Sequence, residues 1–222
     1  MSEVQKKNAV KRRSKGEKTR RLILSAAIEV LAQQGIKGTT HRAVASHADI
    51  QLSLTTYYFK DIQELVFEAF LLCCEEKVKL TLSGWQTILD TLKDYDKTSL
   101  RKAPIKEELG EKLADVTARY LHQGISDNAT YLKVEQLLFA EMQFNPLLAR
   151  VGEDHRTAML KPIEKFCHFL NKKFAQIDAD MLLTQFNQIE YRYLNQTEQT
   201  LSLDEIRQYT QRIIGLLMRI KQ

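Results

Sequence analysis

The chain has 222 residues, of which 44% are hydrophobic, and a formal net charge of +5. This length and apolar content suffice for a buried core in one or two domains. The charged N-terminus has no signal-peptide core, and no apolar run approaches the ~20 residues of a membrane span, so we expect a soluble, cytoplasmic protein. Cys73, Cys74 and Cys167 lack metal-ligand spacing and lie among apolar residues, which indicates reduced core thiols and no cofactor.

Helix dominates the predicted structure. Three prolines and eight glycines are few for this length, and apolar residues recur with the 3.6-residue period of a helix rather than the alternation of a strand. The sequence therefore predicts an all-α protein.

The N-terminus is the most basic part of the chain. Residues 1–21 contain nine lysines and arginines against two glutamates. Each basic residue near a phosphate releases condensed counterions, so such a block suits an arm that follows a polyanion. A solvated tail that maintains solubility is the alternative. We predict a basic flexible arm over residues 1–14.

The first helix is predicted over about residues 15–36. Ser14 and Glu17 form a capping box at its start, an apolar face follows, and Gly35 supplies a C-terminal stop. This helix would be the first of a small N-terminal domain.

Two short helices follow within the same domain. Thr39 or Thr40 caps a helix that runs through His47, a tight turn at "DI" follows, and a third helix covers about 52–58. Three helices with such a turn between the second and third match the helix-turn-helix arrangement. We therefore expect a DNA-binding domain over residues 15–60.

The third helix, "LSLTTYY", is rich in hydroxyl groups. Its exposed residues would face base edges or thymine methyls in the major groove, and the tyrosines at its end would reach phosphate oxygens. The alternative is that Tyr57 and Phe59 only close the small core, and we assign Phe59 to the core. Lys60 precedes a helix N-terminus that favours a phosphate. The candidate DNA contacts are Lys11, Arg12, Arg13, Lys18, Thr40, Arg42, Leu52, Ser53, Thr55, Thr56, Tyr57, Tyr58 and Lys60.

These segments resemble the TetR (tetracycline-repressor-like) family of transcriptional regulators over about residues 18–70. The resemblance rests on "QQGIKGTT", "HRAVASHADI" and "LSLTTYYFKDIQEL", with Thr40 at the start of the second helix and the aromatic, lysine and "EL" pattern that closes the third. Asp49 and Ser53 stand where the family usually has glycine. The resemblance implies a dimeric DNA-binding regulator with a ligand pocket in its larger helical domain.

Residues 61–222 are predicted to form that helical regulatory and dimerisation domain. Asp61 and Glu64 form a capping box that opens a long helix through at least Lys79, with Gly84 as a candidate break. The polar stretch "DYDKTSLRKAPIKEE" is a candidate loop. Further helices are expected at about 106–124, 128–144, 146–175, 178–197 and 203–221, with a kink or break near 158–161 because of Pro162.

The last two predicted helices carry wide apolar stripes. This is more apolar surface than two helices need to dock on a core, so part of it would meet a second copy, as the resemblance also implies. The alternative is that all of it packs within one chain. The candidate dimer-interface residues are Phe186, Ile189, Tyr193, Ile206, Tyr209, Ile213, Leu216 and Leu217.

The middle helices carry aromatic residues and methionines with a few polar side chains. A pocket of this composition suits a hydrophobic or amphipathic small molecule, although most such residues in any helical protein belong to the core. The candidate ligand-binding residues are Trp85, His122, Gln136, Phe139, Met142, Met159, Phe166 and His168.

The sequence contains no catalytic signature such as "HExxH", "GxxxxGK[ST]" or "GxSxG", so we do not expect an enzyme. We predict a transcriptional regulator, a repressor released from a palindromic operator by a hydrophobic ligand. Its partners would be double-stranded DNA, a second copy and an unidentified small molecule, with no membrane. The alternatives are a ligand-independent architectural DNA-binding protein and, with less support, a helical enzyme.

Overall fold

The computed structural model describes residues 3–194 and 201–220, with side chains from Lys15 onward. Every regular element in this part of the chain is helical, which confirms the all-α prediction. The elements are α1 (Glu3–Gly38), α2 (His41–His47), α3 (Leu52–Tyr58), α4 (Ile62–Thr91), the short 3-10 helix η1 (Ser99–Arg101), α5 (Ala103–Asp127), α6 (Ala129–Glu141), α7 (Pro146–Leu170), α8 (Ala175–Tyr193) and α9 (Leu203–Met218).

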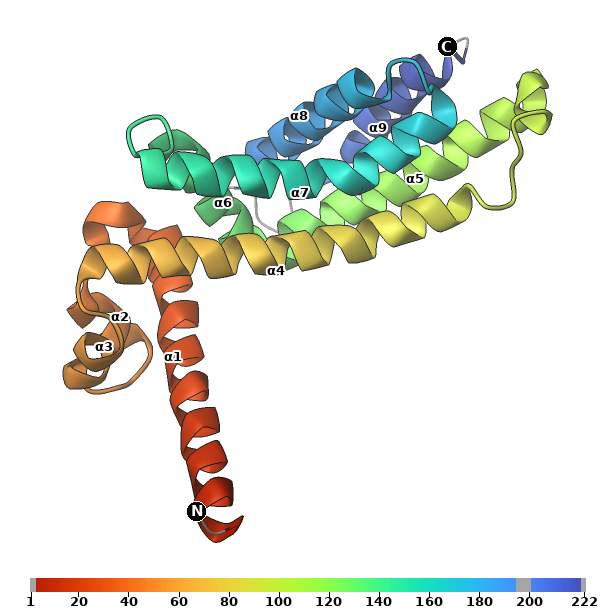
Figure 1. Ribbon diagram of the computed structural model, residues 1–222. Coiled ribbons are helices and arrows are strands. Elements are labelled where there is room, and N and C mark those ends of the chain that lie inside the picture. The colour runs from red at the N-terminus through yellow and green to blue at the C-terminus, as the bar shows by residue number, and fades with distance from the viewer. Residues whose placement is uncertain (1–2, 195–200, 221–222) are drawn as a thin grey trace.

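The helices form an N-terminal group and a larger bundle that share the long helix α4. Figure 1 shows α1, α2 and α3 at one end of α4, while α5, α6 and α7 lie along the rest of its length and α8 and α9 lie beyond them. Helix α1 projects away from the bundle, steeply inclined to α4. A movement of α4 would therefore displace residues in both groups.

The start of α1 differs from the expectation. The backbone is helical from Glu3, so the expected flexible arm is part of α1, and the helix does not begin at Ser14. The predicted stop at Gly35 is a kink, since this residue has φ 68° and the helix continues to Gly38. A left-handed φ is available to glycine at little steric cost, which explains its place at the kink.

Neither Gly84 nor Pro162 interrupts its helix, and tertiary packing explains both. At Gly84 a Cβ atom would lie 2.2 Å from a ring carbon of Tyr120, so this glycine allows α4 and α5 to approach closely without interrupting α4. Pro162 lies inside α7 and is buried, and α7 continues through it. The packing of α7 offsets the missing hydrogen bond.

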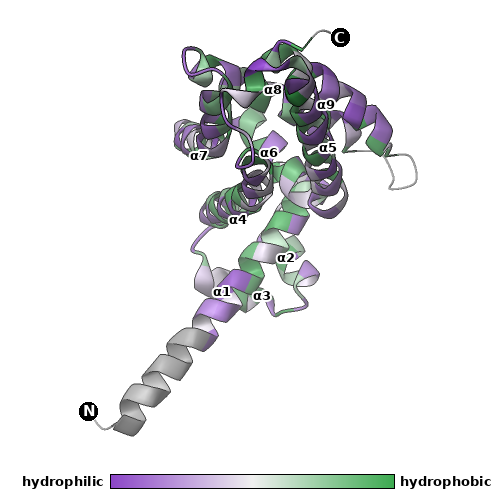
Figure 2. Ribbon diagram, turned by 90° about the vertical axis from the view of Figure 1, so that its right-hand side faces the viewer, coloured by the Kyte–Doolittle hydropathy of each residue, from purple (hydrophilic) through white to green (hydrophobic). Residues whose placement is uncertain are grey.

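The core consists of two apolar clusters, and the N-terminal one extends beyond the DNA-binding helices. It joins residues of α1, α2 and the first half of α4 to Val134 and Leu138 of α6 and to Leu148 and Val151 of α7. In Figure 2 the ribbon of α1 is hydrophobic where this helix meets the rest of the molecule. Helices α6 and α7 therefore pack directly on the N-terminal domain as well as communicating with it through α4.

Candidate functional site

The turn between α2 and α3 has the geometry that the sequence requires. Thr40 caps α2 by accepting a hydrogen bond from the Ala43 N–H at 3.1 Å. At the other end Asp49 has φ 52°, while its N–H donates to Ser46 O and that of Ile50 donates to Ala45 O. This is the Schellman arrangement, in which glycine is usual and aspartate is tolerated. Asp49 therefore replaces the glycine without changing the turn.

Helix α3 has two different threonines. Thr55 is completely buried and its hydroxyl donates to Leu52 O at 2.8 Å, so its assignment as a base contact is corrected. Thr56 is exposed, and its hydroxyl donates to Ser53 O at 3.2 Å. A helical period of 3.6 residues turns these neighbours to different sides. The outward face of α3 is therefore Leu52, Ser53 and Thr56.

The aromatic residues at the end of α3 also differ in burial. Tyr57 is 80% exposed, and its ring lies edge-on to that of Tyr58 with centroids 5.1 Å apart. Phe59 is fully buried beneath the guanidinium group of Arg20, as expected for a core residue. An exposed phenol held beside a second ring can donate to a phosphate while its ring stays packed.

The N-terminus of α4 is already occupied by two carboxylates. Glu64 N–H donates to Asp61 Oδ1 at 2.8 Å, and the Glu64 carboxylate accepts from Lys60 N–H at 2.7 Å. The predicted N-cap at Asp61 is therefore confirmed, but the reciprocal bond of Glu64 goes to the N–H of Lys60 and not to that of Asp61. These negative charges neutralise the helix end and oppose a phosphate there, so the expected backbone phosphate site at α4 is corrected. Only the exposed side chain of Lys60 remains available.

The remaining candidate DNA contacts lie mostly at the surface around α3. Lys18, Thr40, Arg42 and Lys60 are exposed, and Tyr58 is partly buried. Among the residues with described side chains, neither Arg42 nor Lys60 enters an ion pair. The candidates Lys11, Arg12 and Arg13 lie in α1 outside the described side chains.

Half of the candidate dimer-interface residues lie inside the monomer. Phe186, Ile189, Tyr193 and Ile206 are at most 5% exposed and belong to the core cluster of the bundle, so they offer no surface to a second copy. Tyr209, Ile213 and Leu217 are partly buried, and Leu216 is 60% exposed. Exposed apolar residues outside the candidate list are Ile177 and Met181 of α8 and Phe174, which immediately precedes that helix.

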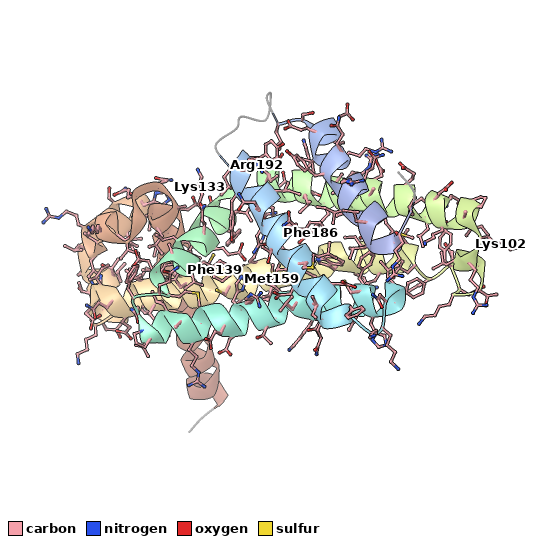
Figure 3. All side chains as sticks on the ribbon, turned by 90° about the horizontal axis from the view of Figure 1, so that it is seen from above. Lys102, Lys133, Phe139, Met159, Phe186 and Arg192 are labelled. Atoms are coloured by element: carbon pink, nitrogen blue, oxygen red, sulfur yellow. The ribbon has the colours of Figure 1, made fainter. Side chains whose placement is uncertain are left out.

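The candidate ligand residues do not gather around one pocket. Trp85, Met159 and Phe166 are packed in the core, and the Trp85 and Phe166 rings lie 5.6 Å apart. Gln136 and His168 are exposed, so their assignment to an internal pocket is corrected. His122, Phe139 and Met142 are partly buried. Figure 3 shows Phe139, Met159 and Phe186 spread along the interior of the bundle rather than converging.

The bundle instead contains a buried polar core that the sequence reasoning missed. Lys77 of α4 lies 3.4 Å from a carboxylate oxygen of Glu190 on α8, with both side chains nearly inaccessible. Glu135 of α6 accepts hydrogen bonds from both neighbouring helices, at 2.6 Å from His155 Nε2 of α7 and at 3.2 Å from the Tyr191 hydroxyl of α8. Four helices thus meet at these five residues.

The electrostatics of this buried polar core are strongly coupled. Burial alone would raise the pKa of Glu135, but the hydrogen bond from His155 and the charge of Lys77 lower it below the usual range. Burial raises the pKa of Glu190 in spite of Lys77. The charges of Glu190 and Glu135 together outweigh burial and raise the pKa of Lys77. The Lys77 ammonium group is therefore charged in the folded protein, and the carboxylates of Glu190 and Glu135 stabilise that charge.

A pattern in the sequence could have revealed these residues. Lys77 follows buried Cys73 by four positions, and His155 stands four positions from both buried Val151 and buried Met159. A charged or polar residue in register with an apolar face is placed in the core by the helical period. The interacting partner is not readable in the same way, because Glu190 is 113 positions from Lys77.

The described part of the chain has neither a candidate metal-binding cluster nor a membrane-spanning helix. It contains no cluster of three or more histidine, cysteine, aspartate or glutamate side chains that could hold a metal ion. None of its helices is long and apolar enough to cross a membrane.

Comparisons with known proteins agree with this geometry. Residues 23–69 match the model of the family described as bacterial regulatory proteins, tetR family. No curated protein matches the chain. At the identities found, the similar solved structures show the fold alone. One is a protein described as a TetR-family regulator from Mesorhizobium loti MAFF303099, with 15% identity and a TM-score of 0.67 over 92% of this chain and 97% of that one. A TetR-family member from Streptomyces coelicolor A3 has 22% identity and a TM-score of 0.56 over 88% of this chain and 97% of that one. The multidrug binding protein EbrR complexed with proflavin has 23% identity and a TM-score of 0.50 over 88% of this chain and 99% of that one.

The family match covers α2, α3 and their flanking helices, the same elements whose caps, turn and exposed face form a helix-turn-helix. The likeness in fold extends over nearly the whole chain. Residues 23–69 therefore match the tetR family at its helix-turn-helix, and the rest of the chain shares the fold of solved TetR-family structures.

Proposed function

We propose that this protein is a dimeric repressor that binds a roughly palindromic operator and is released from it by a small molecule. The observation that carries the DNA-binding part is the outward face of α3. It combines Ser53 and Thr56 with the 80% exposed Tyr57, between the exposed cations Arg42 and Lys60. Short hydroxyls suit base edges, and the phenol and the cations suit the phosphates on either side.

Dimerisation is supported by the outer faces of α8 and α9. Ile177 and Met181 of α8 and Leu216 of α9 are large apolar side chains that are each at least 60% exposed. A dimer would cover them and would set two recognition helices about one duplex turn, ~34–36 Å, apart. Replacing Met181 or Leu216 by Glu should give monomers in light scattering, whereas Leu147→Glu, at an equally exposed site on α7, should leave the dimer intact.

Release by a ligand is supported by the packing between the domains. Helix α6 contacts α1 directly, since Thr130 donates a hydrogen bond to Glu29 at 3.2 Å and Val134 and Leu138 enter the N-terminal cluster. A ligand that prefers one arrangement of the bundle would shift the recognition helices by its differential affinity for the two arrangements. Binding of proflavin by EbrR, a protein of similar fold, is in line with such a role.

Selection of binding sites from fragmented genomic DNA with the purified protein tests the proposal. We expect an inverted repeat whose half-sites are centred about 10 base pairs or a multiple of a duplex turn apart. The genes beside the recovered sites then show whether binding blocks a promoter. Recovery of unrelated sequences with no symmetry would instead favour the architectural DNA-binding protein.

A further inference from the structure

A cleft between α4 and α5 reaches the buried polar core. It has a volume of about 250 Å³ and is bounded by α4, α5 and the side chain of Glu190 from α8. Its rim is open to solvent, and its floor is formed by Lys77, Thr81 and Glu190, each at most 3% exposed. The cleft is therefore a surface opening that ends on buried polar groups.

The lining of the cleft is mostly uncharged and polar. Beyond the floor, hydroxyl and amide side chains come from both helices, and the Tyr120 hydroxyl lies 3.4 Å from Thr81 Oγ1. An apolar ligand would strip water from these groups without replacing their hydrogen bonds, which is unfavourable. The lining residues with polar side chains are Lys77, Thr81, Ser83, Thr87, Tyr120, Gln123, Asn128 and Glu190.

The floor retains hydrogen-bonding capacity. Lys77 Nζ is 3.4 and 3.5 Å from the two carboxylate oxygens of Glu190, longer than the 2.7–2.9 Å typical of charge-assisted hydrogen bonds. An ammonium group has three donors, and within the described part of the chain Glu190 is the hydrogen-bond partner of Lys77. The pair thus offers both donors and acceptors to a third group.

The charge of the floor selects against ions. Lys77 and Glu190 balance each other, so a cationic ligand would compete with Lys77, and an anionic ligand would meet Glu190 with Glu135 behind it. Leaving a buried charge uncompensated is strongly unfavourable. A neutral molecule that both donates and accepts hydrogen bonds leaves this balance unchanged.

We propose that the cleft between α4 and α5 binds a neutral, hydroxyl-rich small molecule about the size of a monosaccharide. The volume is slightly below the roughly 300–1,000 Å³ of pockets for drug-sized ligands, which favours such a small ligand. Hydroxyl groups of the ligand donate to Glu190 and accept from Lys77 and Tyr120. This chemistry differs from the hydrophobic ligand that the sequence suggested.

The position of the cleft gives the ligand a route to DNA binding. Lys77, Thr81 and Gly84 lie on α4, the helix whose other end carries the helix-turn-helix domain. A ligand that bridges α4 to Tyr120 of α5 and Glu190 of α8 changes how α4 is held. The role of the ligand as an effector rests on the function proposed above, whereas its binding to the cleft does not.

Binding is measured on the full-length protein without DNA, by calorimetry and by Trp85 fluorescence. Trp85 is the single tryptophan and follows Gly84 of the cleft. The probes are D-glucose, D-galactose, D-ribose and myo-inositol, with proflavin as the cationic alternative and octanoate as an anionic one with an apolar tail. We expect at least one of the hydroxyl-rich probes to bind saturably.

Two variants locate the bound probe. Tyr120→Phe removes one hydroxyl and should weaken binding ~3- to 10-fold, the effect of one lost hydrogen bond. Gly124→Ala removes no polar group but places a methyl group 3.2 Å from Glu190 Oε1, and should weaken binding at least as much while α5 stays folded. Tyr95→Phe, at a partly buried tyrosine that does not line the cleft, is the matched control and should bind like the parent protein.

Three results would overturn the assignment: saturable binding of none of the four hydroxyl-rich probes at ~10 mM, binding of proflavin or octanoate alone, or equal binding by the parent, Tyr120→Phe and Gly124→Ala proteins. Operator binding is measured separately. If DNA binding and its release by an apolar compound persist while hydroxyl-rich probes fail, the ligand class is wrong and the proposed function stands. If a hydroxyl-rich probe binds but no symmetric operator exists, the proposed function fails alone.

Discussion

The recognition helix α3 and the buried polar core of the bundle use polar side chains in opposite ways. On α3 the hydroxyl-bearing residues Ser53, Thr56 and Tyr57 are exposed. In the bundle, Lys77, Glu135 and Glu190 are at most 3% exposed and depend on one another. Loss of one polar group on α3 should therefore weaken DNA binding, whereas loss of one polar group in the core should lower the stability of the fold.

The difference arises because water solvates the polar groups on α3, whereas protein partners replace water around the polar groups in the core. An exposed hydroxyl is satisfied by water until DNA replaces that water, so it can be removed at little cost to folding. A buried charge has lost its water during folding, and only its partners offset that loss. Separate substitutions in the two regions can test this contrast.

The largest effect is expected at Lys77. Lys77→Met leaves Glu190 buried without its counter-charge, so the free energy of unfolding should fall by ~3–5 kcal/mol in urea denaturation followed by circular dichroism. The double variant Lys77→Met/Glu190→Leu removes both charges and should recover much of that loss. A double variant as unstable as the sum of its single variants would show that the pair is not coupled.

The two buried glutamates should give opposite pH dependences of stability. The pKa of Glu135 is lowered in the folded state, so its stabilising contribution is complete above its unfolded pKa of ~4.3 and is lost as the pH falls through the lower folded value. The pKa of Glu190 is raised, mainly by burial, so its unfavourable contribution is relieved as the pH falls.

Urea midpoints measured from about pH 6 to pH 3 test this pair. Relative to the parent protein, Glu135→Gln should lose less stability over that range and Glu190→Gln should lose more. The same slope for both variants would contradict the opposite directions of their pKa shifts.

The two regions were also unequally predictable from the sequence. The caps and the turn of the helix-turn-helix are local signals, and α3 was predicted at its observed bounds of 52–58. Which threonine faces outward was not settled by such signals, because Thr55 and Thr56 are neighbours with the same propensities. The side on which each lies depends on how α3 docks against α1 and α2.

Non-local packing limited the rest of the prediction. A break at Gly84 and a kink or break near Pro162 were expected from propensity, but Tyr120 against Gly84 and the buried surroundings of Pro162 keep both helices continuous. The apolar stripe of α8 correctly indicated a buried face at Phe186 and Ile189. It did not show that this face serves its own chain, while Ile177 and Met181 lie on the opposite, exposed side.

An intermediate effect is expected at the exposed end of α3. Tyr57→Phe removes one candidate phosphate hydrogen bond, so operator binding measured by fluorescence anisotropy should weaken by ~0.5–1.5 kcal/mol, about 3- to 10-fold. Folding stability should change by less than ~0.5 kcal/mol because the ring is exposed. Tyr95→Phe is the control, and equal DNA affinity for the two variants would remove Tyr57 from the interface.

The smallest effects are expected from substitutions of Thr55 and Thr56. These substitutions test most directly which side of α3 contacts DNA. Thr56→Val removes an exposed hydroxyl and should change the preferred base at one position of each half-site, with less than ~1 kcal/mol lost on the parent operator. Thr55→Val removes a buried hydroxyl that donates to Leu52 O, so it should lower stability by ~1 kcal/mol and leave the preferred sequence unchanged. Both variants are put through the same selection from a randomised duplex pool, with denaturation measured in parallel. A changed base preference in Thr55→Val but not in Thr56→Val would mean that α3 presents its other side to DNA, and the exposed hydroxyls of Ser53 and Thr56 would then no longer be the reading face.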